Sequence, residues 1–127
     1  MKIVIDTSIL VDYIRTGRSL SGLIKLGSSG KTKLMVPVIV IGELMAGRLM
    51  KHRQARESVA KIMKGMSIVD INSEIACRYG EIVRAGMFHG NDAWIAACCL
   101  VHKAKLATLN PKHFIDVKGL GLYNVKQ

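Results

Sequence analysis

Acidic residues are scarce in this chain of 127 residues, which has nine Asp and Glu against nineteen Lys and Arg. Three of them stand where chemistry is expected. Asp6 interrupts the apolar run in KIVIDTSIL, Glu43 falls within the first two turns of a predicted helix, and Asp92 opens an apolar helical segment. A parallel sheet brings such positions to its carboxyl edge, where sites form. We therefore expect these three carboxylates to converge.

Each carboxylate also has a purely structural interpretation. Asp6 and Asp92 could each cap a helix or complement its dipole, which is worth about 1 kcal/mol, and Glu43 could be a solvated helix residue. Two carboxylates about 4 Å apart repel by roughly 4 kcal/mol at an effective dielectric near 20, which exceeds the value of a cap. A converged cluster would need a protonated group or a bound cation, and oxygen ligands without His or Cys favour Mg²⁺ or Mn²⁺.

The formal net charge of +10 favours a polyanionic partner, although a solvated basic surface would explain it equally well. Together with an acidic metal site, it points to metal-assisted hydrolysis of a phosphodiester, in which the cation activates a water and neutralises developing charge. The densest basic segment follows Glu43 and could contact phosphates, with a solvated helix face as the alternative. It holds Arg48, Lys51, His52, Arg53 and Arg56.

Hydrophobic periodicity predicts the elements that would position these residues. Short apolar runs predict strands near 2–5, 33–36, 67–71, 105–109 and 120–125. Helical patterns lie near 8–15, 19–27, 38–49, 51–64, 73–87 and 91–103. We expect Asn72 and Asn91 to cap the last two helices, the second of which is apolar nearly all round. The alternation predicts one α/β domain over residues 1–127 with a mainly parallel sheet.

Other functional patterns are incomplete. Gly30, Lys31 and Thr32 match the end of a phosphate-binding loop, but Lys25 stands where glycine is required and a helix precedes the segment, so we expect an ordinary turn. No G-x-S-x-G surrounds Ser8, which also occupies the place of the second Asp in a phosphatase-like DxD motif. The four histidines lack zinc-ligand spacing.

Cysteine usage and hydropathy indicate the compartment. Cys77, Cys98 and Cys99 form neither a disulfide framework nor a CxxC zinc pattern, so we expect buried thiols in a reducing environment. No apolar run approaches the ~20 residues that would cross a bilayer. We therefore expect a soluble, cytoplasmic protein without a membrane partner.

Four segments, in this order and spacing, resemble the PIN-domain ribonucleases and particularly the VapC-like toxins of type II toxin–antitoxin pairs. They are IVIDTSILVDYIR, IGELMAGR, NDAWIAACCL and LATLNPKHFIDVKGLGLYNV, and the similarity runs from Lys2 to Val125. The resemblance implies a three-layer α/β/α sandwich with a central sheet of four to five strands. It also implies an endoribonuclease that uses one or two Mg²⁺ ions, with Mn²⁺ as a substitute, acts on RNA, forms a homodimer and is neutralised by a cognate antitoxin.

By position, the resemblance makes Asp6, Glu43 and Asp92 the acidic catalytic and metal-binding residues. Thr7 and Thr108 match hydroxyl positions that would orient a carboxylate or a water.

The chain departs from the family at a fourth position. Many relatives carry an acidic residue after the late strand, where this chain has Asn110, whose amide could bind a metal directly or through water without supplying charge. Asp116 could complete the site or be a solvated turn residue. Asn110 also supports a second interpretation, a catalytically decayed PIN-like module that binds RNA or a partner. We interpret Asp12 as structural, because it lies off the helical face that follows Asp6.

Overall fold

The computed structural model describes residues 1–86 and 90–125, and its strands form one sheet. The strands are β1 (Lys2–Ile5), β2 (Lys33–Pro37), β3 (Ser67–Val69), β4 (Lys105–Ala107) and β5 (Leu122–Tyr123). Their order is β3-β2-β1-β4-β5, and every neighbouring pair is parallel. All carboxyl ends of the strands therefore point to the same edge.

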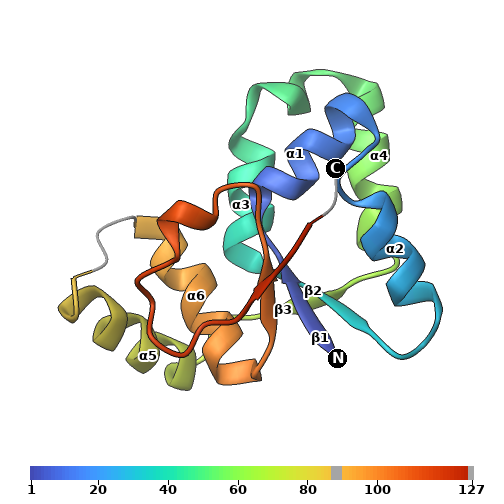
Figure 1. Cartoon of the computed structure of the whole chain (residues 1–127). Coiled ribbons are helices and arrows are strands. Elements are labelled where there is room, and N and C mark those ends of the chain that lie inside the picture. The colour runs from blue at the N-terminus through green and yellow to red at the C-terminus, as the bar shows by residue number, and fades with distance from the viewer. Residues whose placement is uncertain (87–89, 126–127) are drawn as a thin grey trace.

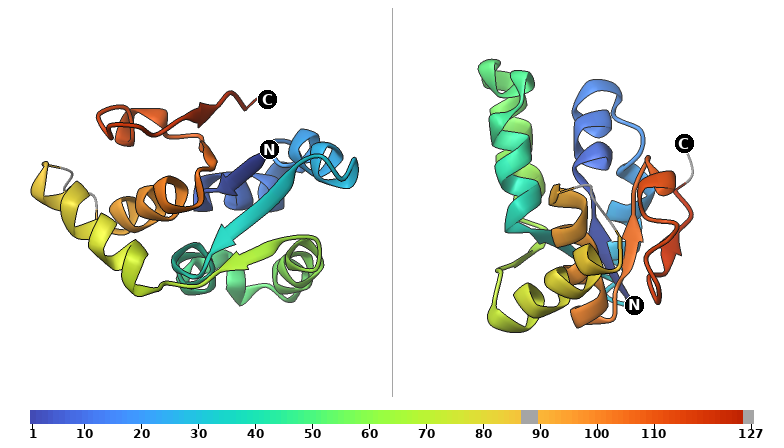
Figure 2. Two further views of the ribbon diagram at one scale, coloured as in Figure 1. Left: turned by 90° about the horizontal axis from the view of Figure 1, so that it is seen from below. Right: turned by 90° about the vertical axis from the view of Figure 1, so that its left-hand side faces the viewer.

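Helices cover both faces of this sheet. Figures 1 and 2 show α5 and α6 on one side and α2 and α4 on the other, which confirms the three-layer α/β/α sandwich. The helices are α1 (Thr7–Thr16), α2 (Ser21–Ser28), α3 (Val38–Ala46), α4 (Arg53–Met63), α5 (Ser73–Arg84) and α6 (Gly90–His102), with 3₁₀ turns η1 (Arg48–Lys51) and η2 (Pro111–His113).

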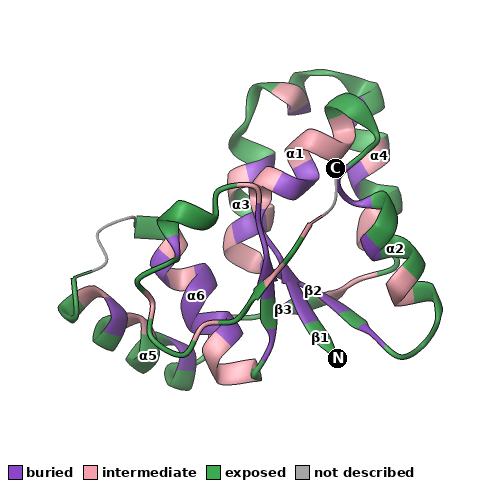
Figure 3. Cartoon of the chain, in the orientation of Figure 1, coloured by how far each residue is buried: buried purple, intermediate pink, exposed green. Residues whose placement is uncertain are grey.

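The core lies along the central strand and the helix beside it. Ile3, Val4 and Ile5 of β1 are fully buried, as expected of a parallel strand covered on both faces. In α6, the residues from Ile95 to Cys99 are fully buried as well, which confirms the prediction from its apolar sequence. Figure 3 shows these buried segments against the exposed outer turns of α5. β1 and α6 together carry Asp6 and Asp92, so the core fixes both carboxylates.

Several predicted boundaries differ from the structure. The helix predicted over 38–49 ends at Ala46, and after the extended Gly47 the chain restarts as η1. The last three strands are shorter than predicted, because their flanking residues turn away from the sheet. The helix predicted over 73–87 ends at Arg84, and residue 87 lies outside the described residues.

The two predicted caps have different outcomes. Asn72 is confirmed, since its side-chain oxygen accepts a hydrogen bond from the Ile75 amide at 2.9 Å. Asn91 was a wrong prediction, because α6 already begins at Gly90 and Asn91 lies inside the first turn. The Gly30–Thr32 segment joins α2 to β2, so it is an ordinary turn, as expected.

The expectation of three buried thiols was wrong for one cysteine. Cys98 and Cys99 are buried, and burial raises the pKa of the Cys98 thiol to about 11, which makes it unreactive. Cys77 is exposed. The buried residues of α5 are Ile75 and Ile82, two turns apart on one face, and Cys77 lies about 200° around the helix from Ile75. None of the described helices is long and apolar enough to span a membrane.

Phe114 anchors the segment that follows β4. Its ring is 1% exposed, whereas the neighbouring Ile115 is 72% exposed. We expect Phe114→Ala to lower the free energy of unfolding by about 3–5 kcal/mol, because it removes a large buried ring, and Ile115→Ala to change it by under about 0.5 kcal/mol. Urea unfolding followed by circular dichroism measures both. Equal effects of the two substitutions would contradict the anchoring role of Phe114.

Candidate active site

Asp6 sits at the carboxyl end of the central strand and is 5% exposed. It occupies the position before the first residue of α1, yet its side chain accepts no hydrogen bond from the helix backbone. Its Oδ2 instead accepts hydrogen bonds from Thr108 Oγ1 at 2.6 Å and Ser8 Oγ at 2.8 Å. The capping interpretation of Asp6 is therefore wrong.

The two hydroxyls are themselves held by the backbone that follows β4. The Leu109 amide donates to Ser8 Oγ and the Asn110 amide donates to Thr108 Oγ1, each at 3.0 Å. Each hydroxyl thus accepts from the backbone and gives its single proton to Asp6. This works because Ile5 of β1 pairs with Ala107 of β4, which places the two strand ends side by side. The two hydroxyls thus satisfy and orient one oxygen of a nearly buried carboxyl.

Glu43 lies in the second turn of α3 and is half-buried. Its Oε1 accepts a hydrogen bond from Thr7 Oγ1 at 2.8 Å. Thr7 is the first residue of α1 and follows Asp6 directly. This contact ties α3 to the start of α1 and holds Glu43 beside the end of β1. Glu43 is therefore not a freely solvated helix residue.

Asp92 lies in the first turn of α6 with its side chain 19% exposed, and its Oδ2 is 3.0 Å from Nδ1 of His113. Burial is the main cause that raises the pKa of the Asp92 carboxyl, followed by the negative charge of Asp6 and, more weakly, that of Glu43. The hydrogen bond and charge of His113 act in the opposite direction. Asp6 and Glu43 are therefore both close enough to act on the Asp92 carboxyl.

Each carboxylate keeps one oxygen available. The other oxygen is held: by two hydroxyls on Asp6, by Thr7 on Glu43 and by His113 on Asp92. Among the described residues, none donates to the remaining oxygens, and no side-chain oxygen that lacks a partner is sealed from solvent. These oxygens are thus open to a ligand on the outer side of the cluster.

The donor set fits Mg²⁺ better than a metal that needs a complete protein cage. In the part of the chain that the structure describes, no three His, Cys, Asp or Glu side chains are arranged to hold one ion together. Mg²⁺ keeps several waters and is usually held by one or two carboxylates, so the carboxylates present do not conflict with it. Asp6 influences the pKa of Asp92 more strongly than Glu43 does.

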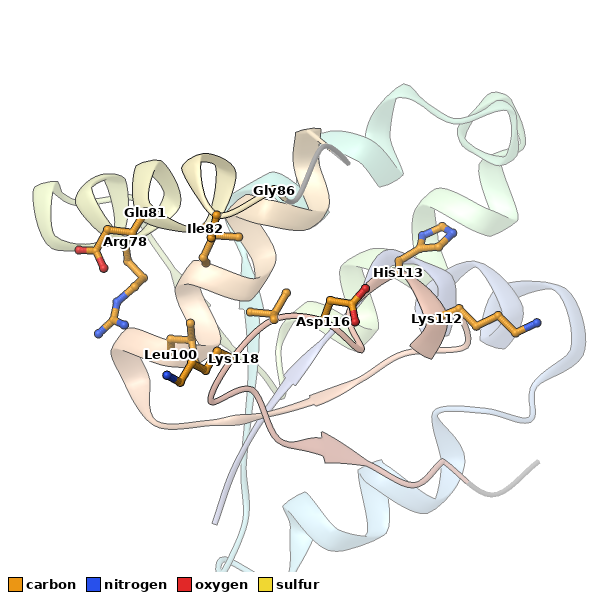
Figure 4. A pocket seen from close by; sticks show the side chains of 11 residues that line it. Arg78, Glu81, Ile82, Gly86, Leu100, Lys112, His113, Asp116 and Lys118 are labelled. Atoms are coloured by element: carbon orange, nitrogen blue, oxygen red, sulfur yellow. The ribbon is translucent and has the colours of Figure 1, made fainter.

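The remaining predicted site residues occupy different surroundings. Thr7 and Thr108 both bond site carboxylates, as the resemblance implied. Asn110 is exposed, and its backbone amide, not its side chain, takes part in the hydroxyl network. Asp116 is exposed and lines a neighbouring cleft together with His113 (Figure 4).

Sequence reasoning missed two residues that contact the carboxylates, Ser8 and His113. Ser8 stands two residues after Asp6 in the DTS segment, and a hydroxyl so close to a predicted carboxylate was the signal that could have found it. His113 is 21 residues from Asp92, and no local pattern connects the two. Asp12, interpreted as structural, is half-buried on α1 and accepts a hydrogen bond from Thr16.

The predicted basic segment is less uniform than its sequence suggests. Arg48 and Lys51 are exposed on η1, and Arg53 forms an exposed ion pair with Glu57 at 3.1 Å. The Arg56 guanidinium donates to the carbonyl of Met50 at 2.7 Å, so it fixes the end of η1. Arg56 therefore has a structural role, whereas the other three basic groups face solvent.

The fold and its acidic site define an α/β/α protein with coupled carboxylates at the carboxyl edge of a parallel sheet. The PIN domain family model matches residues 3–120, and the chain belongs to that family. Ribonuclease VapC1 of Methanocaldococcus jannaschii is 33% identical over 127 residues, covering 95% of this chain and 85% of that protein.

Solved structures share the fold. VapBC2 from Rickettsia felis, bound to a DNA fragment of its promoter, has a chain with a TM-score of 0.86 and 24% identity, covering 99% of this chain and 100% of that one. VapBC-1 from nontypeable Haemophilus influenzae has a chain with a TM-score of 0.78 and 22% identity, with 98% of both chains covered. At these identities, the two likenesses establish the architecture.

The raised pKa of Asp92 makes a prediction about stability. Because folding disfavours ionisation of this carboxyl, stability is lost as the pH rises through its folded pKa. We expect Asp92→Asn to unfold at a higher temperature than the native chain at pH 7 in EDTA, with the difference shrinking below the ordinary Asp value of 3.8. Asp12→Asn should show no such gain, because the hydrogen bond of Asp12 with Ser19 lowers the pKa of that carboxyl. A lower melting temperature for Asp92→Asn at pH 7 would contradict the repulsion.

Proposed function

We propose that this protein is a Mg²⁺-dependent endoribonuclease and the toxin of a toxin–antitoxin pair, with Mn²⁺ able to replace Mg²⁺. The observation that carries the proposal is the set of three carboxylates at the carboxyl edge of the sheet, in which the charges of Asp6 and Glu43 repel that of Asp92 and each group has one oxygen fixed and one open. Such repulsion is relieved by a cation. The 33% identity to a protein named as a ribonuclease supports RNA as the substrate.

Each residue of the candidate site would have its own role in hydrolysis. Asp6 and Asp92 would hold the ion with their open oxygens, while Ser8 and Thr108 keep Asp6 oriented. Glu43, held by Thr7, would position the attacking water and accept its proton. When bound, the ion supplies a lowered pKa for water and compensates the negative charge that builds up on the phosphate and the leaving oxygen.

One ion is the simplest stoichiometry for this donor set. Asn110 can contribute an amide oxygen, directly or through water, but no charge. Asp116 lies on the cleft wall beside His113, so we assign it no ligand role at the first ion. The alternative of a catalytically decayed module remains an outcome of the experiment below, since a decayed site would show no carboxylate-dependent binding of Mn²⁺.

The proposed partners follow from the family. The Rickettsia felis and Haemophilus influenzae structures are described as VapBC, and toxin–antitoxin complexes recur among similar structures, including one from Klebsiella pneumoniae. They support a cognate antitoxin as a partner of this chain. We also propose a homodimer and a cytoplasmic location, both on the family resemblance.

Asp6→Asn should reduce Mg²⁺-dependent cleavage of total RNA by at least about a hundredfold, because loss of about 2.7 kcal/mol of transition-state stabilisation has that effect. Its affinity for Mn²⁺, measured by calorimetry, should fall in parallel. Asp12→Asn replaces the same residue type at a half-buried position on α1, away from the site carboxylates, and should keep both properties. Full cleavage by folded Asp6→Asn would refute the assignment, and absent Mn²⁺ binding by the native chain would favour the decayed module.

The exposed basic groups near Glu43 should contribute to RNA affinity. An exposed ion pair such as Arg53 with Glu57 is worth about 0.2–1 kcal/mol, so a phosphate can replace Glu57. Each of Arg48→Ala, Lys51→Ala and Arg53→Ala should lower the salt slope of single-strand RNA binding by about 0.7. Fluorescence anisotropy at several salt concentrations measures the slope. If the salt slope of RNA binding is the same in all three variants as in the native chain, this segment does not contact the RNA.

A further inference from the structure

A cleft of about 660 Å³ lies beside the carboxylates, between α5, the end of α6 and the segment after β4 (Figure 4). Its volume falls in the range of roughly 300–1,000 Å³ that small ligands occupy in proteins. His113 lines the cleft and is also the residue that bonds Asp92. The cleft therefore begins where the proposed reaction takes place.

The middle of the cleft is apolar. Ile82 of α5, Leu100 of α6 and Val117 of the segment after β4 form its walls. They are aliphatic, so a planar group can lie against them without a specific stacking partner. A surface of this kind would accept any nucleobase, with little preference among the four.

The end of the cleft farther from His113 is basic. Figure 4 shows Arg78 of α5 and Lys118 of the segment after β4 both pointing toward that end, while Lys112 extends away from α5. Neither Arg78 nor Lys118 forms an ion pair with any carboxylate in the described part of the chain. Two cations from separate elements thus share one end of the cleft, and an anion between them would relieve their repulsion.

The cleft also contains two carboxylates. Glu81 lies about one helical turn after Arg78 on α5, and Asp116 lies near His113. Both are exposed, so water screens their effect on a phosphate. A carboxylate can also accept a hydrogen bond from an amino group of a base, as Asp and Glu do with cytosine. The two carboxylates therefore fit a nucleotide, whose base carries hydrogen-bond donors, better than they fit a simple inorganic anion.

We propose that this cleft binds one nucleotide of the RNA strand next to the phosphate that is cut. The base lies against Ile82, Leu100 and Val117, the outer phosphate binds Arg78 and Lys118, and the scissile phosphate reaches the carboxylates at the His113 end. This subsite rests on the proposed function. A protein segment could fill an apolar cleft too, but the paired cations and the continuity with Asp92 favour RNA.

The test is RNA binding in EDTA, where no cleavage occurs. The probe is a fluorescein-labelled single-stranded RNA of mixed sequence, and fluorescence anisotropy gives its affinity over a range of salt. Arg78→Ala and Lys118→Ala should each lower the salt slope by about 0.7, the contribution of one phosphate contact to a single strand. A second RNA that contains 4-thiouridine should cross-link to residues 78–86 or 112–118 on irradiation.

Matched controls come from the same chain. Arg84 is exposed on α5 outside the cleft lining, and Lys25 is exposed on α2. Arg84→Ala and Lys25→Ala should leave the slope unchanged. Equal slopes in cleft and control variants, with cross-links confined to other segments, would overturn the proposal and leave the cleft to a protein partner.

The outcome is independent of catalysis. If the native chain fails to cleave RNA with Mg²⁺ but the cleft variants still lose slope, the proposed function fails and the nucleotide site stands. If the native chain cleaves RNA and the cleft variants bind and cross-link as it does, only the nucleotide site is overturned.

Discussion

The site depends on one arrangement, the two hydroxyl protons that converge on Oδ2 of Asp6. A carboxylate that is 5% exposed at the end of a fully buried strand would be strongly destabilising without donors. Ser8 comes from α1 and Thr108 from the end of β4, and each is held by a backbone amide after β4. The charge is therefore stabilised by the same parallel pairing of β1 with β4 that builds the sheet.

This arrangement explains why the cluster is tolerated in the fold. The carboxylates of Asp6, Glu43 and Asp92 oppose one another, and the protein offsets the repulsion by donors placed on one side of each group. Among the described residues, no hydrogen-bond donor is found for the remaining oxygens, and none of them is sealed from solvent. The repulsion lowers the folding stability of the protein without a cation, and the same repulsion would favour cation binding. Loss of stability at functional sites with buried charge is common.

The sequence predicted the fold well, because strongly apolar strands alternate with helices and α6 is apolar all round. It also led us to expect Asp6, Glu43 and Asp92 at one edge, since topology places the ends of parallel strands together, and the structure shows that Asp6 and Glu43 both act on Asp92. It could not predict the hydrogen bond between His113 and Asp92 or that from Arg56 to the carbonyl of Met50, because those contacts depend on how loops pack. Asn91 and Cys77 were misjudged because one residue of helix phase or length decides whether a side chain caps, packs or faces solvent.

The buried ring of Phe114 has a consequence for where an RNA strand would be cut relative to the nucleotide in the cleft. His113 precedes it directly and Lys118 follows four residues later, so one anchored turn holds both ends of the proposed nucleotide cleft. The spacing between them is set when the protein folds and does not have to be formed on binding. If the cleft binds a nucleotide as proposed, the turn would hold the bond that is cut at a constant distance from that nucleotide.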